Sequence, residues 1–97
     1  MGRAEGLLQR MRQTAHGWRQ RDFITVLEYH GYEFVRNVNH GAMFRHPKLA
    51  RHPDIAVRQG LAHVVIPRGD ELREYVRDDV VASIDALLTL EAEKKHE

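Results

Sequence analysis

Apolar residues in the first third of the chain recur at the spacing of an α-helix. In residues 21–30 the side chains Phe23, Val26 and Leu27 fall on one stripe. Gly31 comes next, and glycine readily adopts the left-handed conformation that ends many helices. The pattern therefore predicts a helix over 21–30 that is capped by Gly31.

Three later segments alternate between apolar and polar residues in the manner of half-buried strands. They cover residues 32–36, 42–45 and 62–66, and Pro67 ends the third. We expect these strands to form a small antiparallel meander. Residues 47–60 show no sustained periodicity, so we interpret them as a long loop.

The N-terminal residues 1–18 are predicted to be an extension outside the main domain. Leu7, Leu8 and Met11 have helical spacing, but Gly6 interrupts the segment. We therefore expect a short helix that docks weakly on the rest of the chain.

The C-terminal part returns to helical spacing after a short apolar set around Val76. Asp78 or Asp79 can cap a helix there, because aspartate side chains accept hydrogen bonds from the first backbone N–H groups. The apolar positions of that helix are Val80, Val81, Ile84, Leu87 and Leu88. We expect the helix to cover the sheet, and we expect the charged tail 91–97 to be a frayed turn or disordered.

Together these elements predict an α+β domain over residues 19–90. The order helix-strand-strand-strand-helix gives a three-stranded antiparallel sheet with helices on one face, and it leaves the other face open to a ligand. A chain of 97 residues can bury one modest hydrophobic core.

Composition narrows the chemistry that this domain can carry out. The chain has no cysteine, which excludes disulfides, thiolate catalysis and every zinc site that needs cysteine. It also has no apolar run that could span a bilayer and no apolar segment of a signal peptide near Met1. We interpret the protein as cytoplasmic, and we expect no metal and no small-molecule cofactor.

The net charge of +1 conceals an uneven distribution. Residues 1–68 contain 11 Lys and Arg against 5 Asp and Glu, whereas residues 69–97 contain 4 against 9. A basic surface on the first part suits a polyanion, because Lys and Arg that neutralise phosphates supply most sequence-independent affinity for nucleic acids. The acidic last segment is expected to lie away from that surface. Ordinary solvated faces remain the alternative explanation.

One segment, residues 36–47, places a histidine in a turn between two apolar strands with an arginine on each side. Around it the chain carries features in a recognisable order: Gly31, Tyr32, Phe34, Arg36, the histidine-bearing turn, Phe44, His46, Pro47 and later Val64-Val65-Ile66-Pro67-Arg68. In this order they resemble the HicA toxins of bacterial toxin-antitoxin systems. The resemblance covers about residues 19–90.

The resemblance implies a fold like that of double-stranded-RNA-binding domains and an endoribonuclease that cleaves mRNA without a metal. It further implies a partner, a HicB-type antitoxin, that covers the catalytic histidine. The family's turn usually reads Gly-Ser-His, and counting from Arg36 and from Phe44 places that histidine on Gly41, one residue after His40. A bulge at Gly41 would bring His40 to the family position, so we assign the catalytic role to His40.

Metal-free RNA cleavage needs a base for the 2′-hydroxyl, donors for the phosphorane and an acid for the departing 5′-oxygen. Histidine suits both proton transfers near neutral pH. We assign proton transfer to His40, phosphate contact to Arg36 and Arg45, and turn organisation or substrate hydrogen bonding to Asn39. To the RNA-binding set we add His46, as a second proton carrier, and Lys48.

Three other interpretations remain open. His40 can be a turn residue that satisfies a backbone carbonyl, in which case the domain binds RNA without cleaving it. The domain can instead be a protein-interaction module. The even spacing of His40, His46 and His52 before Asp54 suggests a metal site, but it lacks the tight local spacing of structural zinc ligands.

Overall fold

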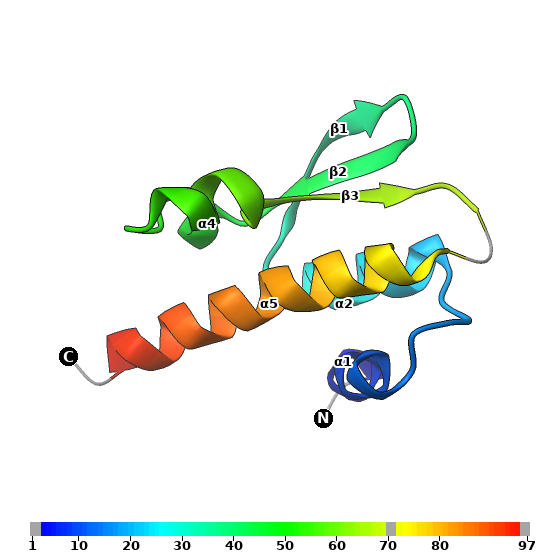
Figure 1. Ribbon diagram of the computed structural model, residues 1–97, viewed down its shortest axis with the longest axis horizontal. Coiled ribbons are helices and arrows are strands. Elements are labelled where there is room, and N and C mark those ends of the chain that lie inside the picture. Colours follow the sequence, from blue (N-terminus) through cyan, green and yellow to red (C-terminus); the bar gives the residue numbers. More distant parts are fainter. Residues whose placement is uncertain (1–2, 70–71, 96–97) are drawn as a thin grey trace.

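The computed structural model describes residues 3–69 and 72–95, and it contains a three-stranded antiparallel sheet with helices packed against one face (Figure 1). The strands are β1 (Glu33–Val38), β2 (Gly41–Arg45) and β3 (His63–Pro67), and they lie side by side in that order. The α+β class and the antiparallel meander predicted from the sequence are therefore confirmed.

Helix α2 (Gln20–Tyr29) forms one half of the helical layer. The stripe predicted from the sequence, Phe23, Val26 and Leu27, has no exposed surface in the structure. Gly31 follows with a φ of +91°, a backbone conformation that residues with a Cβ rarely adopt. The glycine cap at this position is confirmed.

Helix α5 (Glu74–Lys95) is one continuous helix that runs beneath the whole sheet. Val76, Val80 and Ile84 are buried at intervals of four residues, so the apolar set around Val76 and the predicted later helix share one face. The predicted start at Asp78 or Asp79 was wrong, since both residues lie within the helix. The tail prediction was also wrong as far as Lys95; residues 96–97 lie outside the described range. Within that range, none of the helices is long and apolar enough to cross a membrane.

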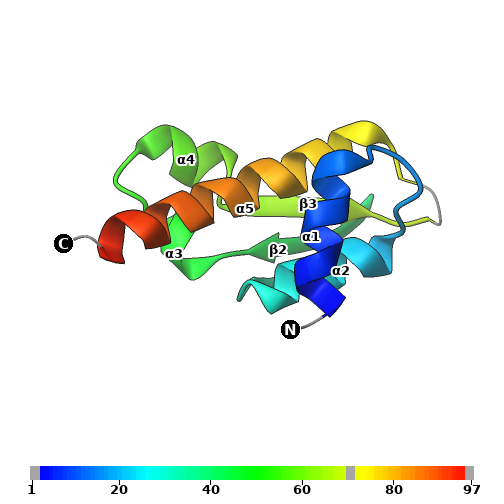
Figure 2. The same cartoon turned by 90° about the horizontal axis from the view of Figure 1, so that it is seen from below.

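Helix α1 (Arg3–Gln13) makes a third layer on the side of α2 and α5 that faces away from the sheet (Figure 2). Met11 is fully buried, and its backbone oxygen accepts a hydrogen bond of 3.2 Å from Nη1 of Arg77. Arg12 also binds both carboxylate oxygens of Asp85. The expected weak docking was wrong, because the helix contributes a core residue and is tied to α5 by charged side chains.

The segment 47–60, interpreted as a long loop, contains two short helices: α3 (Pro47–Ala50) and α4 (Ile55–Gly60). Each begins at a side chain that accepts a backbone N–H. Nδ1 of His46 accepts from Lys48, and Oδ1 of Asp54 accepts from Ala56. Proline at the first position of α3 suits a helix start. Elements this short show too few apolar repeats for a periodicity to be visible in the sequence.

Candidate nucleic-acid interface

The face of the sheet that the helices leave uncovered carries rows of side chains from all three strands. Arg45 of β2 stands opposite Glu33 of β1 and His63 of β3. In the next row, which is closer to the turn between β1 and β2, Met43 stands opposite Arg36 and Val65. We call this surface the open face.

A bulge in β1 determines that Arg36 belongs to the open face. The register between β1 and β2 shifts between Phe34 and Arg36, so the two residues point to opposite sides although they are two positions apart. Phe34 meets the ring of Phe44 at 5.8 Å, edge to face, whereas Arg36 stands opposite Met43. The bulge thus turns the Arg36 guanidinium toward the open face, and no sequence pattern marked its position at Val35.

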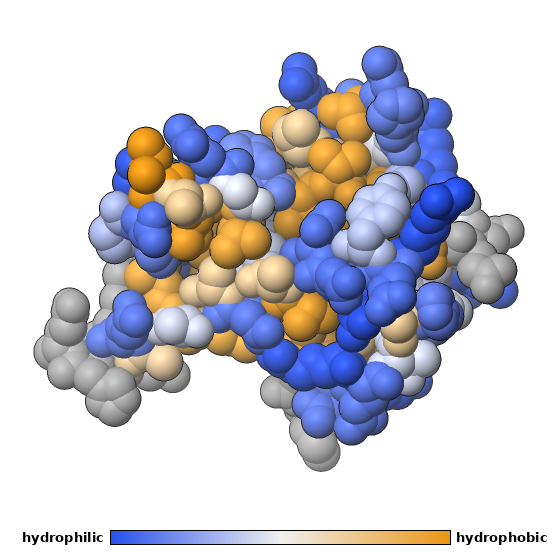
Figure 3. Space-filling view, in the orientation of Figure 1, coloured by the Kyte–Doolittle hydropathy of each residue, from blue (hydrophilic) through white to orange (hydrophobic). Residues whose placement is uncertain are grey.

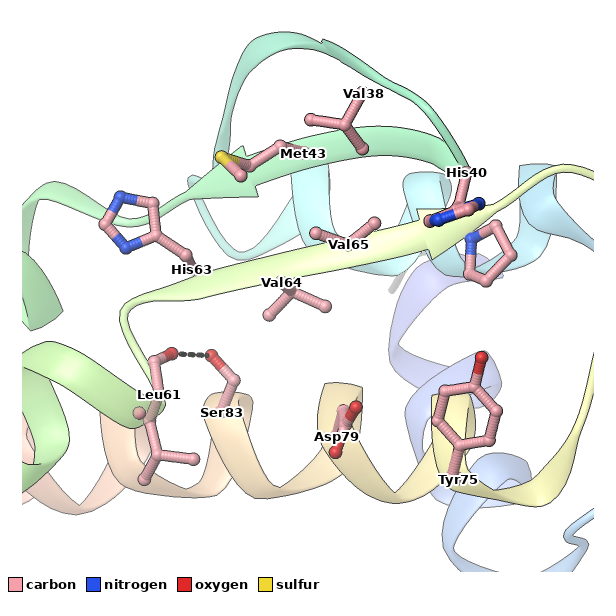
Figure 4. Close-up of a pocket in the computed structure, with 12 residues that line it drawn as sticks. Val38, His40, Met43, Leu61, His63, Val64, Val65, Tyr75, Asp79 and Ser83 are labelled. Carbon is pink, nitrogen blue, oxygen red and sulfur yellow. Dashed lines mark hydrogen bonds between the residues drawn. The ribbon is translucent and has the colours of Figure 1, made fainter.

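His40 lies in the two-residue turn that joins β1 to β2. Val38 pairs with Gly41, so Asn39 and His40 form the turn itself, and both are exposed. The backbone oxygen of His40 accepts a hydrogen bond of 3.3 Å from Arg68, which fastens the turn to the end of β3. The imidazole is therefore held at one end of the open face (Figure 4), next to the paired residues Gly41 and Pro67.

Gly41 occupies the position where the resemblance to HicA toxins would place a histidine, and the structure leaves no room for a side chain there. A Cβ built on Gly41 would lie 2.0 Å from the backbone oxygen of Ile66 and 2.7 Å from the Cα of Pro67. No side chain fits there, because Cβ atoms essentially never lie within 3.0 Å of other heavy atoms outside their own neighbourhood. The bulge that we expected at Gly41 is absent; the strand irregularity is at Val35 instead. The histidine one position earlier is the one that the hairpin can present.

The two arginines of the predicted site lie at different distances from His40. Arg45 is at the far end of β2, four residues from Gly41, or roughly 13 Å at 3.3 Å per residue. It faces Glu33 at 4.0 Å, and both side chains are about half exposed or more. Arg36 is nearer the turn, two residues before Val38. A single phosphate cannot contact all three side chains, but an extended polyanion can.

His46 does not lie on this surface, which corrects its assignment to RNA contact and proton transfer. It is 5% exposed, and Nδ1 accepts the N–H of Lys48 while Nε2 lies 3.0 Å from the backbone oxygen of His30. Because Nδ1 accepts, Nε2 carries the proton and donates it to His30. Burial lowers the pKa of His46, more than the His30 carbonyl raises it. Its role is to cap α3 in the neutral form.

Lys48 is likewise separated from the open face. Its ammonium nitrogen lies 2.9 Å from Oε2 of Glu91 and ties α3 to the last turns of α5. The hydrogen bond from Lys48 is the main reason that the pKa of Glu91 is lowered. The structure thus places Lys48 at a contact between helices and not on the open face, and its RNA-binding role stays a prediction.

A groove with a volume of about 580 Å³ borders the open face along β3. One end holds His40 and Pro67, and the other holds His63 and Leu61; the side opposite β3 is formed by Tyr75, Asp79 and Ser83 of α5 (Figure 4). Burial, and then the neighbouring Asp78, raise the pKa of Asp79.

Sequence reasoning missed His63 and Asp79. The alternation of β3 placed His63 and Val65 on one face, a signal that was available, but nothing in the sequence placed Asp79 beside a strand. The expectation that the acidic segment lies away from the candidate surface is wrong at Asp79.

The only serine of the chain, Ser83, belongs to a buried chain of hydrogen bonds behind this groove. Its hydroxyl donates to the backbone oxygen of Leu61 at 2.7 Å, so the Tyr32 hydroxyl, 2.6 Å away, donates to Ser83. Burial raises the pKa of Tyr32 to about 12. These hydrogen bonds join α5 to the residue before β1 and to the residue that ends α4 before β3. They therefore fix the two walls of the groove relative to each other.

The histidines spaced six residues apart do not converge. His46 is buried under α3, and Nδ1 of His52 accepts the N–H of Asp54 at 2.9 Å. Across residues 3–69 and 72–95 no three histidine or carboxylate side chains are placed to hold a metal ion. Comparison with protein-family models, with curated proteins and with solved structures finds no match to this chain.

Proposed function

We propose that this protein is a metal-independent endoribonuclease that cleaves mRNA, as its resemblance to HicA toxins implies, with His40 as general acid and base. The observation that supports this most is the exposed imidazole of His40 at the end of an open sheet face that also carries Arg36. The proposal extends to a fold related to double-stranded-RNA-binding domains, to action in the cytoplasm and to neutralisation by a HicB-type antitoxin.

In the proposed reaction His40 takes the proton of a ribose 2′-hydroxyl. The 2′-oxygen then attacks the adjacent phosphorus, the bond to the 5′-oxygen breaks, and a 2′,3′-cyclic phosphate forms. The 5′-oxygen leaves as a hydroxyl after receiving a proton from the imidazolium or from water. Arg36 is the cation nearest the turn along β1, and it would neutralise charge on the phosphate.

The remaining assignments follow from the geometry of the open face. Arg45, at the far end of β2, would contact a different phosphate of the same strand, and Asn39 would orient the turn or the ribose. His63 shares the row of Arg45 and is too far from His40 for the two to act on one phosphodiester. With a single histidine, the expected gain from proton transfer is about 10² to 10⁴ in rate, which describes a slow nuclease.

A non-catalytic RNA-binding module is the second candidate function, and a specific observation favours it. Gly41 occupies the position where the resemblance places the catalytic histidine, and no side chain fits there. In this alternative Arg36 and Arg45 hold the RNA backbone, and His40 contributes no more than a polar turn residue.

Induced expression of three forms in a bacterial host separates the two functions: wild type, His40→Ala and the control His16→Ala. His16 is also exposed but lies in the segment between α1 and α2, far from the open face. The nuclease proposal predicts growth arrest and loss of mRNA integrity with wild type and His16→Ala but not with His40→Ala, while purified His40→Ala still binds RNA. If wild type and His40→Ala give the same outcome, His40 has no catalytic role.

A further inference from the structure

Strand β3 is an edge of the sheet, and its outer edge faces the groove. Backbone N–H of His46 bonds to the oxygen of Ala62, and N–H of Arg68 bonds to the oxygen of His40. In an antiparallel ladder the groups of alternate residues point to the same side. The even-numbered residues of β3 therefore pair with β2, and the odd-numbered residues direct their backbone groups outward.

Within residues 3–69 and 72–95 no other strand pairs with these outward groups. His63 and Val65 each offer an N–H and a carbonyl oxygen, and Pro67 offers a carbonyl oxygen alone. Leu61, the C-terminal cap of α4, comes before the strand, and its backbone oxygen is taken by the Ser83 hydroxyl at 2.7 Å. That bond closes the approach to β3, so the open part of the edge begins at His63.

The open edge covers five residues, His63–Pro67, or roughly 16 Å of strand. Figure 3 shows apolar surface over the middle of this side of the molecule, where β3 runs in Figure 1, with hydrophilic atoms around it. An unprotected edge of this kind is a template for another strand. The groove of about 580 Å³ between β3 and α5 leaves room beside that edge.

The two sides of the groove indicate the chemistry of a strand that would fill it. On the open face such a strand would extend the row of Met43 and Val65, and Val65 is 38% exposed, so apolar side chains fit there. On the side of α5 it would meet Tyr75, which is 56% exposed, and the carboxylate of Asp79. A lysine or arginine fits this side, with its aliphatic stem on the tyrosine ring and its charge on the carboxylate.

The same charges argue against a second copy of this chain as the occupant. A two-fold pairing of β3 with itself would bring α5 of the second copy beside α5. Glu74 and Asp78 are paired with Arg77, but no cation among the described residues pairs with Asp79, so the Asp79 carboxylates of the two copies would repel one another. RNA is disfavoured for a related reason, since its phosphates would meet Asp79 and it has no backbone N–H to pair with the oxygens of His63 and Val65.

We propose that β3 accepts an extended segment of a partner protein, added as a fourth antiparallel or parallel strand, whose residues alternate between apolar and basic side chains. The backbone of the segment pairs with His63 and Val65, its basic side chains face Asp79, and its apolar side chains extend the row of Met43 and Val65. The proposal does not depend on nuclease activity.

The test uses two short synthetic peptides, one alternating valine with lysine and the other alternating valine with glutamate. Hydrogen exchange of the His63 and Val65 amides reports strand pairing directly, because those N–H groups point outward in the free protein. The lysine peptide is expected to slow exchange at both amides and to bind at least about ten-fold more tightly than the glutamate peptide.

Asp79→Lys is expected to remove that preference. Glu93→Lys, an equal charge change at an exposed position late in α5, is expected to leave it unchanged.

Three results would overturn the proposal. One is unchanged exchange at both amides when the lysine peptide is in excess. Another is equal binding of the two peptides, which would remove the role of Asp79. The third is protection that grows with protein concentration alone, or that an oligoribonucleotide produces, since either would assign the edge to another occupant. If Asp79→Lys proves unfolded by circular dichroism, Asp79→Asn replaces it and is expected to weaken the lysine preference. None of these results depends on RNA cleavage, so failure here is distinct from failure of the nuclease proposal.

Discussion

Replacing Gly41 by alanine tests the geometry that gives His40 its place in the hairpin. The added Cβ would lie 2.0 Å from the oxygen of Ile66 and 2.7 Å from both the carbonyl carbon of Ile66 and the Cα of Pro67. All three are backbone atoms, so no side-chain rotation relieves the contact. β2 and β3 would have to separate by about 1 Å or more to restore ordinary contact distances.

The size of the effect follows from that separation. Overpacking of this kind costs typically about 1–3 kcal/mol, and each weakened ladder hydrogen bond adds about 1 kcal/mol. Alanine also restricts the unfolded chain, which offsets about 0.4–1 kcal/mol. We expect Gly41→Ala to lower the free energy of unfolding by about 2 kcal/mol, which reduces the ratio of folded to unfolded protein by a factor of roughly 30.

Urea unfolding followed by circular dichroism measures this change, with Gly60→Ala as the matched control. Gly60 is in α4, and a Cβ there meets nothing within 4 Å. The control is therefore expected to be as stable as wild type or more stable by about 0.5–1 kcal/mol. A Gly41→Ala protein as stable as Gly60→Ala would show that the hairpin and β3 are not in the contact described, and the position of His40 would have to be revised.

Two further predictions concern buried groups that titrate. The pKa of Tyr32 is raised to about 12 in the folded state, so the stability that the neutral Tyr32 contributes is complete below pH 10 and is lost as the pH rises from 10 to about 12. Tyr32→Phe should lack this alkaline loss of stability, which is at most roughly 3 kcal/mol for two pKa units. Alkaline urea titrations that are parallel for the two proteins would contradict it. The pKa of His46 is lowered in the folded state, so its contribution is present above about pH 6.5 and is lost as the pH falls through the folded value. His46→Gln should accordingly show a shallower fall in stability below pH 6.5 than wild type, and an equal fall would remove His46 as the cause.

A helix or strand could be predicted from the sequence wherever one strong pattern of apolar residues marked it. The stripe of Phe23, Val26 and Leu27 with Gly31 after it located α2, and the alternation around Val64 located β3 to within a residue. The start of α5 was misplaced at Asp78 or Asp79. Aspartates occur both at the start of a helix and on its exposed side, so their presence did not distinguish the two positions. Helices α3 and α4 were missed because one turn holds no repeat.

The candidate site could be predicted only in part, for reasons of register and long-range contact. No pattern in the sequence located the bulge at Val35, although that bulge decides which face Arg36 occupies. His46 and Lys48 stand next to the hairpin in sequence, yet the start of α3 turns one into the interior and the other toward Glu91. Asp79 is about 40 residues from the turn, and only the packing of α5 against β3 brings it to the groove.

The most direct test of the central claim is cleavage of a defined mRNA by purified protein in the presence of EDTA, with the products analysed for 2′,3′-cyclic phosphate ends. Wild type and His16→Ala are expected to give those ends at equal rates, and His40→Ala is expected to be slower by about 10² to 10⁴. Cleavage by His40→Ala at the wild-type rate, or no cleavage by wild type while it still binds the RNA, would contradict the account.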